Sequence, residues 1–317
     1  MSQDKQEDTS DYWMRCMRSG AFEEAWHFSD KVLQSRAGQP CWHWPRHLQY
    51  IWDGSSFEGK RVLVRCYHGL GDTIQFIRYA PLLKAIAAKV IVWAQAPLIP
   101  ILETAQGIDE LLPLHDGTPE VEYDIDVEIM ELPHIFRTTL NTIPLDIPYL
   151  QVPPQPLSSE NGHLAVGLVW KPGDWNEQRA VPFPLLAPLA NVPGIKLYIL
   201  QANAQAAGWQ NGFGINPGEF SLYEFARVVS SLDLIISVDS MPVHLAGALG
   251  VPVWTLLHAE ADWRWMDNRE DSPWYPTMRL FRQERAGDWE SLILRVAGEL
   301  EVLAQNSLHY LVKYSPE

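Results

Sequence analysis

Residues 232–257 have the sequence LDLIISVDSMPVHLAGALGVPVWTLL, and this stretch decides the fold class. It contains two apolar runs of strand length, at 234–239 and 251–257. Between them, residues 240–250 are predicted to form a helix, because Ser240 can cap it and Pro242 lies in its first turn. A strand, a helix and a second strand in this order predict a parallel sheet covered by helices.

The same alternation continues toward the N-terminus. Further strands are predicted at 164–170 and 195–201 and a helix at 220–232, and an amphipathic helix over 289–305 is expected to end this half. An earlier block repeats the pattern, with strands at 61–67, 89–95, 109–114 and 123–129, a helix at 72–88 and helical residues within 96–105. The two blocks therefore predict two α/β units.

A segment rich in proline, serine and glycine, PPQPLSSENG at 153–162, separates the two blocks and is predicted to be a linker. We expect Rossmann-like parallel-sheet domains over 53–155 and 156–317, facing a cleft that is a common place for a ligand. The final helix is expected to pack back toward the first of these domains.

A helical extension is predicted over residues 1–52. Residues 12–36 read as two short helices with a turn at Ser19-Gly20, similar to one degenerate tetratricopeptide unit, and no repeat follows. The next stretch, CWHWPRHLQYIW at 41–52, contains Cys41, His43 and His47. A structural zinc site usually needs four ligands, so we interpret this stretch as aromatic packing.

Composition excludes several classes of protein. The 317-residue chain carries a formal charge of −15, which disfavours nucleic acid as a partner. Three cysteines make no disulfide framework and fit a reducing compartment. Neither a signal peptide nor a run long enough for a membrane-spanning helix is visible, so we expect a cytoplasmic protein without an integral membrane segment. Peripheral membrane contact stays open.

The turn from Asp239 to His244 is the first candidate site. Ser240 and His244 are four residues apart and share a helix face, and free N–H groups at the helix start suit a diphosphate. An ordinary capped helix with a partly buried histidine explains the same pattern.

The loop His68-Gly69-Leu70-Gly71-Asp72 lies between the first strand and its helix and is the second candidate. Two glycines permit a tight turn and close approach of a ligand. A nicotinamide or flavin cofactor is disfavoured, because Ile74 stands where the third glycine belongs and no acid ends the next strand. Asp72 can cap the helix, and it can also accept a proton from a hydroxyl.

Two further segments carry weaker signals. Lys171 and Arg179 lie in the loop after the strand at 164–170, where an open α/β sheet places its ligands, and Arg179 can clamp a phosphate or be a solvated surface residue. The tract Asp262-Trp263-Arg264-Trp265 offers indoles that can stack on a sugar or pack a core.

Taken in order, these pieces resemble glycosyltransferase family 9, the ADP-heptose:lipopolysaccharide heptosyltransferase group, in its tetratricopeptide-associated bacterial branch. The segments that carry the resemblance are HGLGDTIQFIRYAPLL, VGLVWKPGDWNEQRAVPFPLLAPL, LDLIISVDSMPVHLAGALGVPVWTLL and DWRWMDNREDSPWYPTMRLFRQ. The likeness extends from about residue 50 to residue 290. It implies a GT-B fold and an inverting, metal-independent transfer from a nucleotide diphosphate sugar, ADP- or UDP-linked, with no other cofactor.

The resemblance also implies roles for individual residues. Asp72 matches the catalytic base, and Arg179 matches the residue that contacts the donor phosphate. The donor-binding set is Gly69, Gly71, Lys171, Arg179, Gln201, Asp239, Ser240, Met241 and His244. Acceptor or sugar contacts are expected from His68, Gln75, Asp262, Trp263 and Arg264.

Several positions depart from the family pattern and keep other functions open. Met241 replaces a small residue, Ala202 and Asn203 follow Gln201 where relatives often carry a lysine, and Ala180 replaces a serine. Met241 and the missing lysine favour a catalytically silent nucleotide-sugar or protein-binding module on the same fold, whereas Asp72, Arg179 and His244 favour the transferase. An epimerase or hydrolase would turn over without an acceptor. The acceptor, whether glycan, lipid-linked or protein, is not specified by the sequence.

Overall fold

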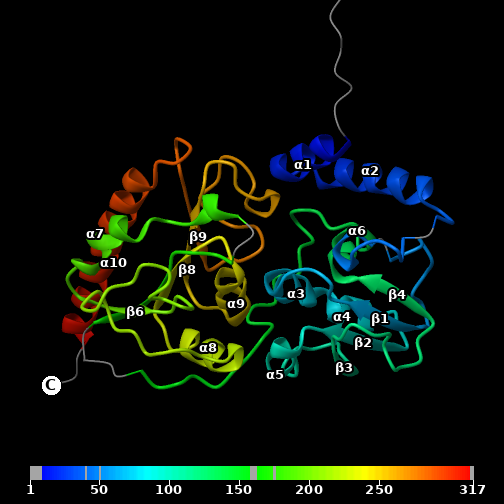
Figure 1. Cartoon of the computed structure of the whole chain (residues 1–317), viewed down its shortest axis with the longest axis horizontal. Helices are drawn as coiled ribbons and strands as arrows, with labels where there is room; N and C mark the ends of the chain where they lie inside the picture. The colour runs from blue at the N-terminus through cyan, green and yellow to red at the C-terminus, as the bar shows by residue number, and fades with distance from the viewer. Residues whose placement is uncertain (1–8, 40, 50, 158–162, 174–175, 315–317) are drawn as a thin grey trace, which may run out of the picture. The chain divides into compact units, whose positions relative to one another are not determined.

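The computed structural model describes residues 9–39, 41–49, 51–157, 163–173 and 176–314 (Figure 1). The chain forms two units, the first made of residues 1–146 with 261–269 and the second of residues 147–260 with 270–317. Each unit contains one parallel sheet with helices, so the predicted α/β class is confirmed. Residues 158–162 of the predicted linker lie outside the described residues.

The first unit is built on a four-stranded sheet with the order β3-β2-β1-β4. Its strands are β1 (Arg61–Arg65), β2 (Lys89–Ala94), β3 (Glu110–Pro113) and β4 (Ile125–Glu128), and all pairs are parallel. The central strands β1 and β2 are buried over nearly their whole length, as expected for a parallel sheet covered on both faces. All four predicted strands of this block are confirmed.

The helix predicted over 72–88 is broken into three pieces, which corrects that prediction. The chain forms α3 (Leu70–Phe76), a 3-10 turn η2 (Ile77–Tyr79) and α4 (Ala80–Lys84). Pro81 has no N–H for a helical hydrogen bond, so it is tolerated in the first turn of a new helix and not inside a long one. Short helical turns follow two of the other strands: η3 (Ala96–Leu98) and α5 (Ile99–Leu102) come after β2, and η4 (Ile129–Glu131) and α6 (Leu132–Ile135) come after β4.

The predicted N-terminal helix pair is confirmed as α1 (Thr9–Ser19) and α2 (Phe22–Ser35), and it belongs to the first unit. Trp13 meets Trp263 edge-on, with ring centres 5.5 Å apart, and the Trp26 indole N–H donates to the Thr138 carbonyl at 2.6 Å. The hairpin is therefore anchored to the segment 261–269, which contains the turn η7 (Trp263–Trp265), and to the loop after α6.

The interpretation of residues 41–52 as an aromatic packing segment is wrong for two of its tryptophans. Trp42 is 58% exposed and Trp44 is 41% exposed, although Cys41 and Ile51 are buried. The segment contains the short turn η1 (Arg46–Leu48), whose leucine is also exposed. The indoles of Trp42 and Trp44 therefore lie at the surface of the first unit.

The second unit contains a five-stranded parallel sheet with the order β6-β5-β7-β8-β9. Four strands were predicted, and the structure has them as β5 (Leu164–Val169), β6 (Ile195–Ile199), β7 (Leu234–Val238) and β8 (Val253–Leu257). The fifth strand, β9 (Met278–Arg282), was not predicted and forms an edge of the sheet.

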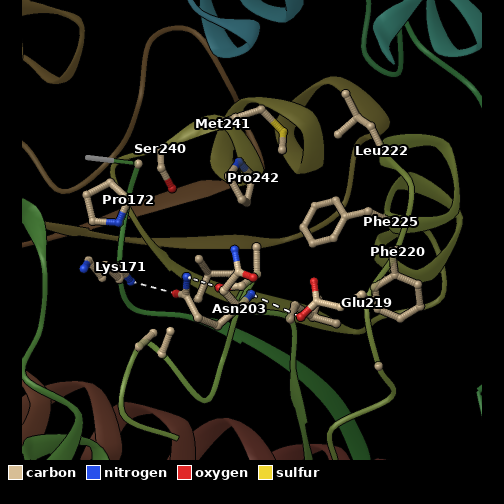
Figure 2. A pocket seen from close by; sticks show the side chains of 18 residues that line it. Lys171, Pro172, Asn203, Glu219, Phe220, Leu222, Phe225, Ser240, Met241 and Pro242 are labelled. Carbon is tan, nitrogen blue, oxygen red and sulfur yellow. Dashed lines mark hydrogen bonds between the residues drawn. The ribbon is translucent and has the colours of Figure 1, made fainter. Parts of the chain in front are cut away.

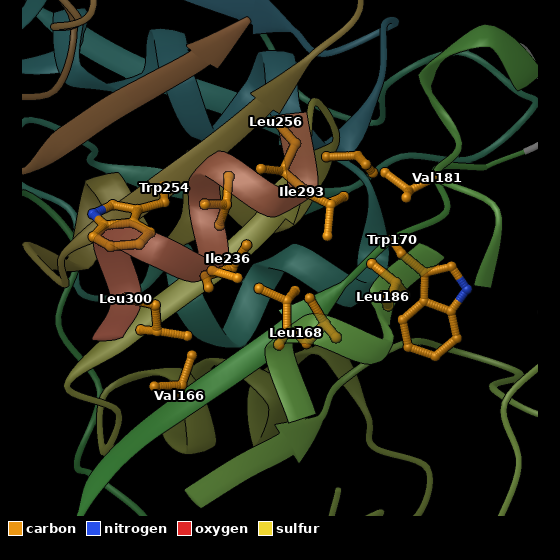
Figure 3. Packing of buried hydrophobic residues seen from close by; sticks show 14 of the residues in the cluster. Val166, Leu168, Trp170, Val181, Leu186, Ile236, Trp254, Leu256, Ile293 and Leu300 are labelled. Atoms are coloured by element: carbon orange, nitrogen blue, oxygen red, sulfur yellow. The ribbon is translucent and has the colours of Figure 1, made fainter. Parts of the chain in front are cut away.

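A hydrophobic cluster of this unit lies between the sheet, the 3-10 turn η6 (Phe183–Leu186), α7 (Ala187–Ala190) and α10 (Trp289–Tyr314) (Figure 3). The unit also contains α8 (Leu222–Val229), α9 (Met241–Leu249) and the 3-10 turn η5 (Glu177–Arg179). Ile293 and Leu300 of α10 are fully buried in the same cluster as Leu168 and Ile236. Truncating such a side chain to alanine costs about 2–5 kcal/mol of unfolding free energy. The predicted packing of this helix toward the first unit stays a prediction.

Among the described helices, none combines the length and the apolar composition that crossing a bilayer requires.

Candidate functional site

A cavity of about 590 Å³ opens at the carboxyl ends of β5, β6 and β7 in the second unit (Figure 2). This is the edge where open α/β sheets bind ligands. The cavity is lined by Val169, Lys171, Pro172, Gly173, Leu200, Gln201, Ala202, Asn203, Ala206, Ala207, Gly218, Glu219, Phe220, Leu222, Phe225, Ser240, Met241 and Pro242. Four of the predicted donor-binding residues, Lys171, Gln201, Ser240 and Met241, are thus brought together.

Gln201 ties the ends of two strands together beneath the cavity. Its side-chain oxygen accepts the backbone N–H groups of Trp170 at 3.0 Å and Lys171 at 2.8 Å, and its amide donates to the Ala202 carbonyl. Gln201 therefore fixes the backbone from which Lys171 enters the site. Asp174 and Trp175, farther along the same loop, lie outside the described residues.

The start of α9 forms one wall of the cavity, through Ser240, Met241 and Pro242 (Figure 2). Ser240 occupies the N-cap position, but the prediction that its side chain caps the helix is wrong: the hydroxyl donates backward to the Val238 carbonyl at 3.1 Å. The extended backbone of Ser240 leaves the positive end of the helix dipole at the cavity, a position that favours an anion.

The opposite wall consists of residues that the sequence did not single out. Glu219 accepts the backbone N–H of Asn203 at 3.2 Å, and Phe220 and Phe225 face the cavity beside it (Figure 2). The helix predicted over 220–232 in fact begins at Leu222, after Ser221. The capping box that Ser221 forms with Glu224 is the sequence signal that could have shown this wall to be a loop.

Arg179 and Asp239 form an ion pair in the second unit. A guanidinium nitrogen of Arg179 lies 3.3 Å from Asp239 Oδ2 and donates to the Asp239 carbonyl oxygen at 3.3 Å. Both side chains are largely buried. Arg179 is thereby held against the residue that immediately precedes the N-cap of α9, although it is not among the residues that line the cavity.

His244 is brought to α9 as predicted, but it points into the core. Its Nδ1 lies 3.0 Å from the Tyr275 hydroxyl, and the side chain is nearly fully buried. The Tyr275 ring can approach α9 because residue 247 is glycine: a Cβ there would lie 2.3 Å from the ring. His244 therefore supports the helix and does not line the cavity.

In the first unit, Asp72 lies at the start of α3. Gly69 is the N-cap, Gly71 follows in the first turn, and the Gly69 N–H donates to Asp72 Oδ2 at 2.9 Å. Asp72 is thus at the third helical position and not at the cap itself. Its side chain stays 24% exposed, so the carboxylate remains accessible.

The other oxygen of Asp72 is held by Arg264. The Arg264 guanidinium donates to Asp72 Oδ1 at 2.5 Å, to Gln75 Oε1 at 2.7 Å and to Asp262 Oδ1 at 2.9 Å. The same guanidinium lies over the Trp263 ring, 4.7 Å from its centre. Four of the residues expected to contact acceptor or sugar are therefore joined in one network around Asp72.

His68, the fifth of these residues, pairs with the buried carboxylate of Glu128, which the sequence analysis did not identify as a site residue. Its Nδ1 lies 2.9 Å from Glu128 Oε1, at the end of β4. Burial opposes the charge on His68, but the hydrogen bond to Glu128 and the negative charges of Glu128 and Asp72 outweigh it and raise the pKa of His68 above its ordinary value.

Within the part of the chain that the structure describes, no three histidine, cysteine, aspartate or glutamate side chains gather as a metal site would require. Cys41, His43 and His47 therefore do not converge on one point.

Comparisons with known proteins agree with this architecture. Residues 202–285 match the family described as glycosyltransferase family 9 (heptosyltransferase). Protein FlbA of Caulobacter vibrioides is 26% identical over 289 residues, which cover 80% of this chain and 48% of FlbA. The chain thus spans about half the length of this curated relative.

Two solved structures share the fold. One is a glycosyl transferase family 9 protein from Veillonella parvula, with a TM-score of 0.54 and 15% identity, covering 81% of this chain and 99% of that one. The other is ADP-heptose lipopolysaccharide heptosyltransferase II of E. coli, with a TM-score of 0.52 and 16% identity, covering 78% and 99%. Residues 202–285 therefore resemble glycosyltransferase family 9 (heptosyltransferase), and the two solved structures show that the fold is shared.

Proposed function

We propose that the protein is an inverting, metal-independent glycosyltransferase that moves a sugar, heptose by analogy, from a nucleotide diphosphate sugar to a hydroxyl acceptor. The observation that carries this proposal is the cavity at the carboxyl ends of β5, β6 and β7, with the start of α9 in its wall. It has the size of a pocket for a drug-sized ligand, about 300–1,000 Å³, and the helix end supplies an anion site.

The charges of the cavity orient the donor within it. Lys171, Ser240 and Met241 lie on one side, whereas Glu219, Phe220 and Phe225 lie on the other (Figure 2). A diphosphate is repelled by Glu219 and attracted by the lysine and the helix end, so it belongs on the first side. The nucleoside then lies on the second side, where a carboxylate can accept ribose hydroxyls and phenyl rings can contact the base.

Asp72 is the proposed base of the reaction. It draws a proton from the acceptor hydroxyl while that oxygen attacks the anomeric carbon, and the bond from this carbon to the phosphate oxygen breaks. The nucleoside diphosphate leaves with the electron pair of that bond. The start of α9 stabilises the charge of the diphosphate, which is the role a metal ion plays in other transferases. Arg179, held against Asp239 next to that helix start, adds its positive charge from behind the cavity wall.

Arg264 and Gln75 act as positioning residues in this proposal. Gln75 is fully buried and is engaged with Arg264, and Arg264 is itself largely buried between Asp72 and Asp262. Their contribution is to hold the carboxylate of Asp72 in one orientation.

A catalytically silent binding module is the second candidate, and the position of Met241 in the cavity wall favours it, because this side chain takes up donor space. It would bind nucleotide and transfer nothing.

The test is an assay of transfer from ADP-heptose or a UDP-sugar to three acceptors: a lipopolysaccharide core, a lipid-linked glycan and a protein. The two quantities measured are the nucleotide released and the mass of the product. We expect acceptor-dependent release with inversion at the anomeric carbon. Asp72→Asn should lose roughly 10²–10⁴-fold in rate and keep nucleotide affinity. Nucleotide binding without transfer to any acceptor would favour the silent module, and release without an acceptor would favour a hydrolase.

A further inference from the structure

A second cavity, of about 250 Å³, lies in the first unit between the end of α2 and the segment that follows it. We call it the tryptophan pocket, because three indoles line it together with three polar side chains: Trp42, Trp44, Trp52, Arg36, Gln39 and Asp53. None of these residues belongs to the network around Asp72 or to the donor cavity.

Two of the three indoles are exposed in a way that core packing does not explain. Trp42 and Trp44 are the residues with 58% and 41% exposure, and exposed aromatic groups gathered at a hollow mark a binding surface more often than isolated ones do. The Trp42 ring is supported from within the unit, because the buried guanidinium of Arg65 lies 5.5 Å from its centre and pairs with Asp126.

The polar side of the pocket is already ordered. Arg36 donates to Glu131 Oε1 at 3.1 Å and to the Trp52 carbonyl at 3.1 Å, while the Trp52 backbone N–H donates to Glu131 Oε2 at 3.0 Å. The Trp52 indole N–H donates to the Ser55 carbonyl at 2.9 Å. A ligand therefore meets walls that need little rearrangement, which lowers the entropic cost of binding.

Charge selects the class of ligand. Arg36 is balanced by Glu131, and Asp53 adds a negative charge, so the lining favours a neutral molecule over a phosphate or another anion. The net charge of −15 also disfavours an anionic membrane surface. Flat indoles suit the apolar C–H face of a sugar ring, while guanidinium, amide and carboxylate groups suit its hydroxyl edge.

Size limits the ligand to one ring, since the cavity is smaller than the range of about 300–1,000 Å³ that drug-sized ligands occupy. We propose that the tryptophan pocket binds a neutral sugar ring of the acceptor glycan. This assignment rests on the proposed transferase function, because that function requires a sugar-bearing or other hydroxyl acceptor.

The pocket is linked to the proposed base through bonds within the first unit. Glu131, which holds Arg36 and Trp52, also accepts the Glu128 backbone N–H at 3.0 Å. The carboxylate of Glu128 in turn pairs with the His68 ring, and the negative charge of Asp72 contributes to the raised pKa of His68. A ring bound in the pocket is therefore anchored to the same hydrogen-bonded framework that holds His68, in the loop that leads to Asp72.

The test is ligand-observed NMR of the full chain with methyl α-mannoside, methyl β-glucoside and N-acetylglucosamine as probes. We expect saturable binding of at least one, weakened tenfold or more by Trp42→Ala and by Trp44→Ala and retained in part by Trp42→Phe. Leu48→Ala is the matched control, because Leu48 is exposed in the same segment but does not line the pocket. Unchanged melting temperatures show that the variants are folded.

ADP titration on the same samples separates this proposal from the proposed function. Sugar binding without nucleotide binding would contradict the transferase and leave the pocket in place, whereas nucleotide binding without sugar binding would overturn the pocket. Competition by inorganic phosphate, Trp42-dependent binding to phosphatidylcholine vesicles, or loss of a dimer in Trp42→Ala without sugar binding would each overturn it as well.

Discussion

Arg264 donates a hydrogen bond of 2.5 Å to Asp72 Oδ1, although the two residues are 192 positions apart in the chain. The same guanidinium holds Gln75 and Asp262, and its face lies over Trp263. A carboxylate fixed in this way keeps one orientation, with Oδ2 held by the Gly69 N–H. The proposed base is therefore positioned by the segment 261–269, which belongs to the first unit although the residues on both sides of it belong to the second.

Replacing Arg264 by methionine should lower the transfer rate by roughly 10²-fold, because misplacing a reacting group by about 1 Å costs that much. Nucleotide affinity should stay unchanged, since Arg264 and the donor cavity belong to different units. Arg264→Lys should recover part of the rate. The assay is transfer kinetics with nucleotide titration, and Arg137→Met, at an exposed arginine of the first unit, is the control. Full activity in Arg264→Met would contradict the positioning role.

Glu219 should determine how the ribose is recognised. Glu219→Gln should weaken ADP binding about tenfold, since losing a charged hydrogen-bond acceptor costs about 1.5 kcal/mol. The wild-type protein should prefer ADP to 2′,3′-dideoxy-ADP, and the variant should lose most of that preference. Calorimetry with both nucleotides measures this, and Glu284→Gln, at an exposed glutamate of the same unit, is the control. Tighter ADP binding by Glu219→Gln would mean that the diphosphate and not the ribose lies beside this carboxylate.

Gly247 should be intolerant of a side chain. A Cβ would lie 2.3 Å from the Tyr275 ring, so Gly247→Ala forces the ring that holds His244 to move and should cost about 1–3 kcal/mol of unfolding free energy. Gly298→Ala in the exposed middle of α10 meets nothing within 4 Å and should be neutral or stabilising by up to about 1 kcal/mol. Urea unfolding compares the two. Equal changes in unfolding free energy for Gly247→Ala and Gly298→Ala would show that the Tyr275 ring is not closely packed against α9.

His68 should make stability depend on pH. Its pKa is raised in the folded protein, so the stabilisation that it provides is present below the unfolded pKa of about 6.5 and is lost as pH rises through the folded value. The difference in unfolding free energy between the wild type and His68→Gln should therefore be larger at about pH 6 than at about pH 9. His27→Gln, at an exposed histidine of α2, shows the effect of removing a histidine elsewhere. A difference that grows with pH would contradict the Glu128 pairing.

Local patterns predicted most of the sheet, because strands buried on both faces appear as continuous apolar runs. β7 and β8 are buried at every position and were predicted within two residues of their ends. β9 was not predicted, because Arg279 and Arg282 interrupt its apolar residues. Such charged residues are tolerated there because β9 lies at the edge of the sheet. The break at Pro81 could have been predicted from the missing N–H, whereas the burial of His244 depends on Tyr275, 31 positions away.

The candidate site was predicted unevenly for the same reason. Four donor-binding residues could be predicted, because they follow the ends of strands and lie in segments that resemble the family. They line one cavity: Lys171, Gln201, Ser240 and Met241. Glu219 and Glu128 were missed, because a lone carboxylate in a loop or at a strand end has no distinguishing local pattern. The contact between Arg264 and Asp72 joins two distant segments, and only the folded chain brings them together.

The most direct measurement is calorimetric titration of ADP, UDP and GDP into the 317-residue protein, repeated with Arg179→Ala. Arg295→Ala, at an exposed arginine of the same unit, is the matched control. The account predicts saturable binding of one nucleotide, weakened about tenfold or more by Arg179→Ala and unchanged by Arg295→Ala. A folded protein that binds none of the three nucleotides would contradict the assignment of the donor cavity, and with it the proposed transferase.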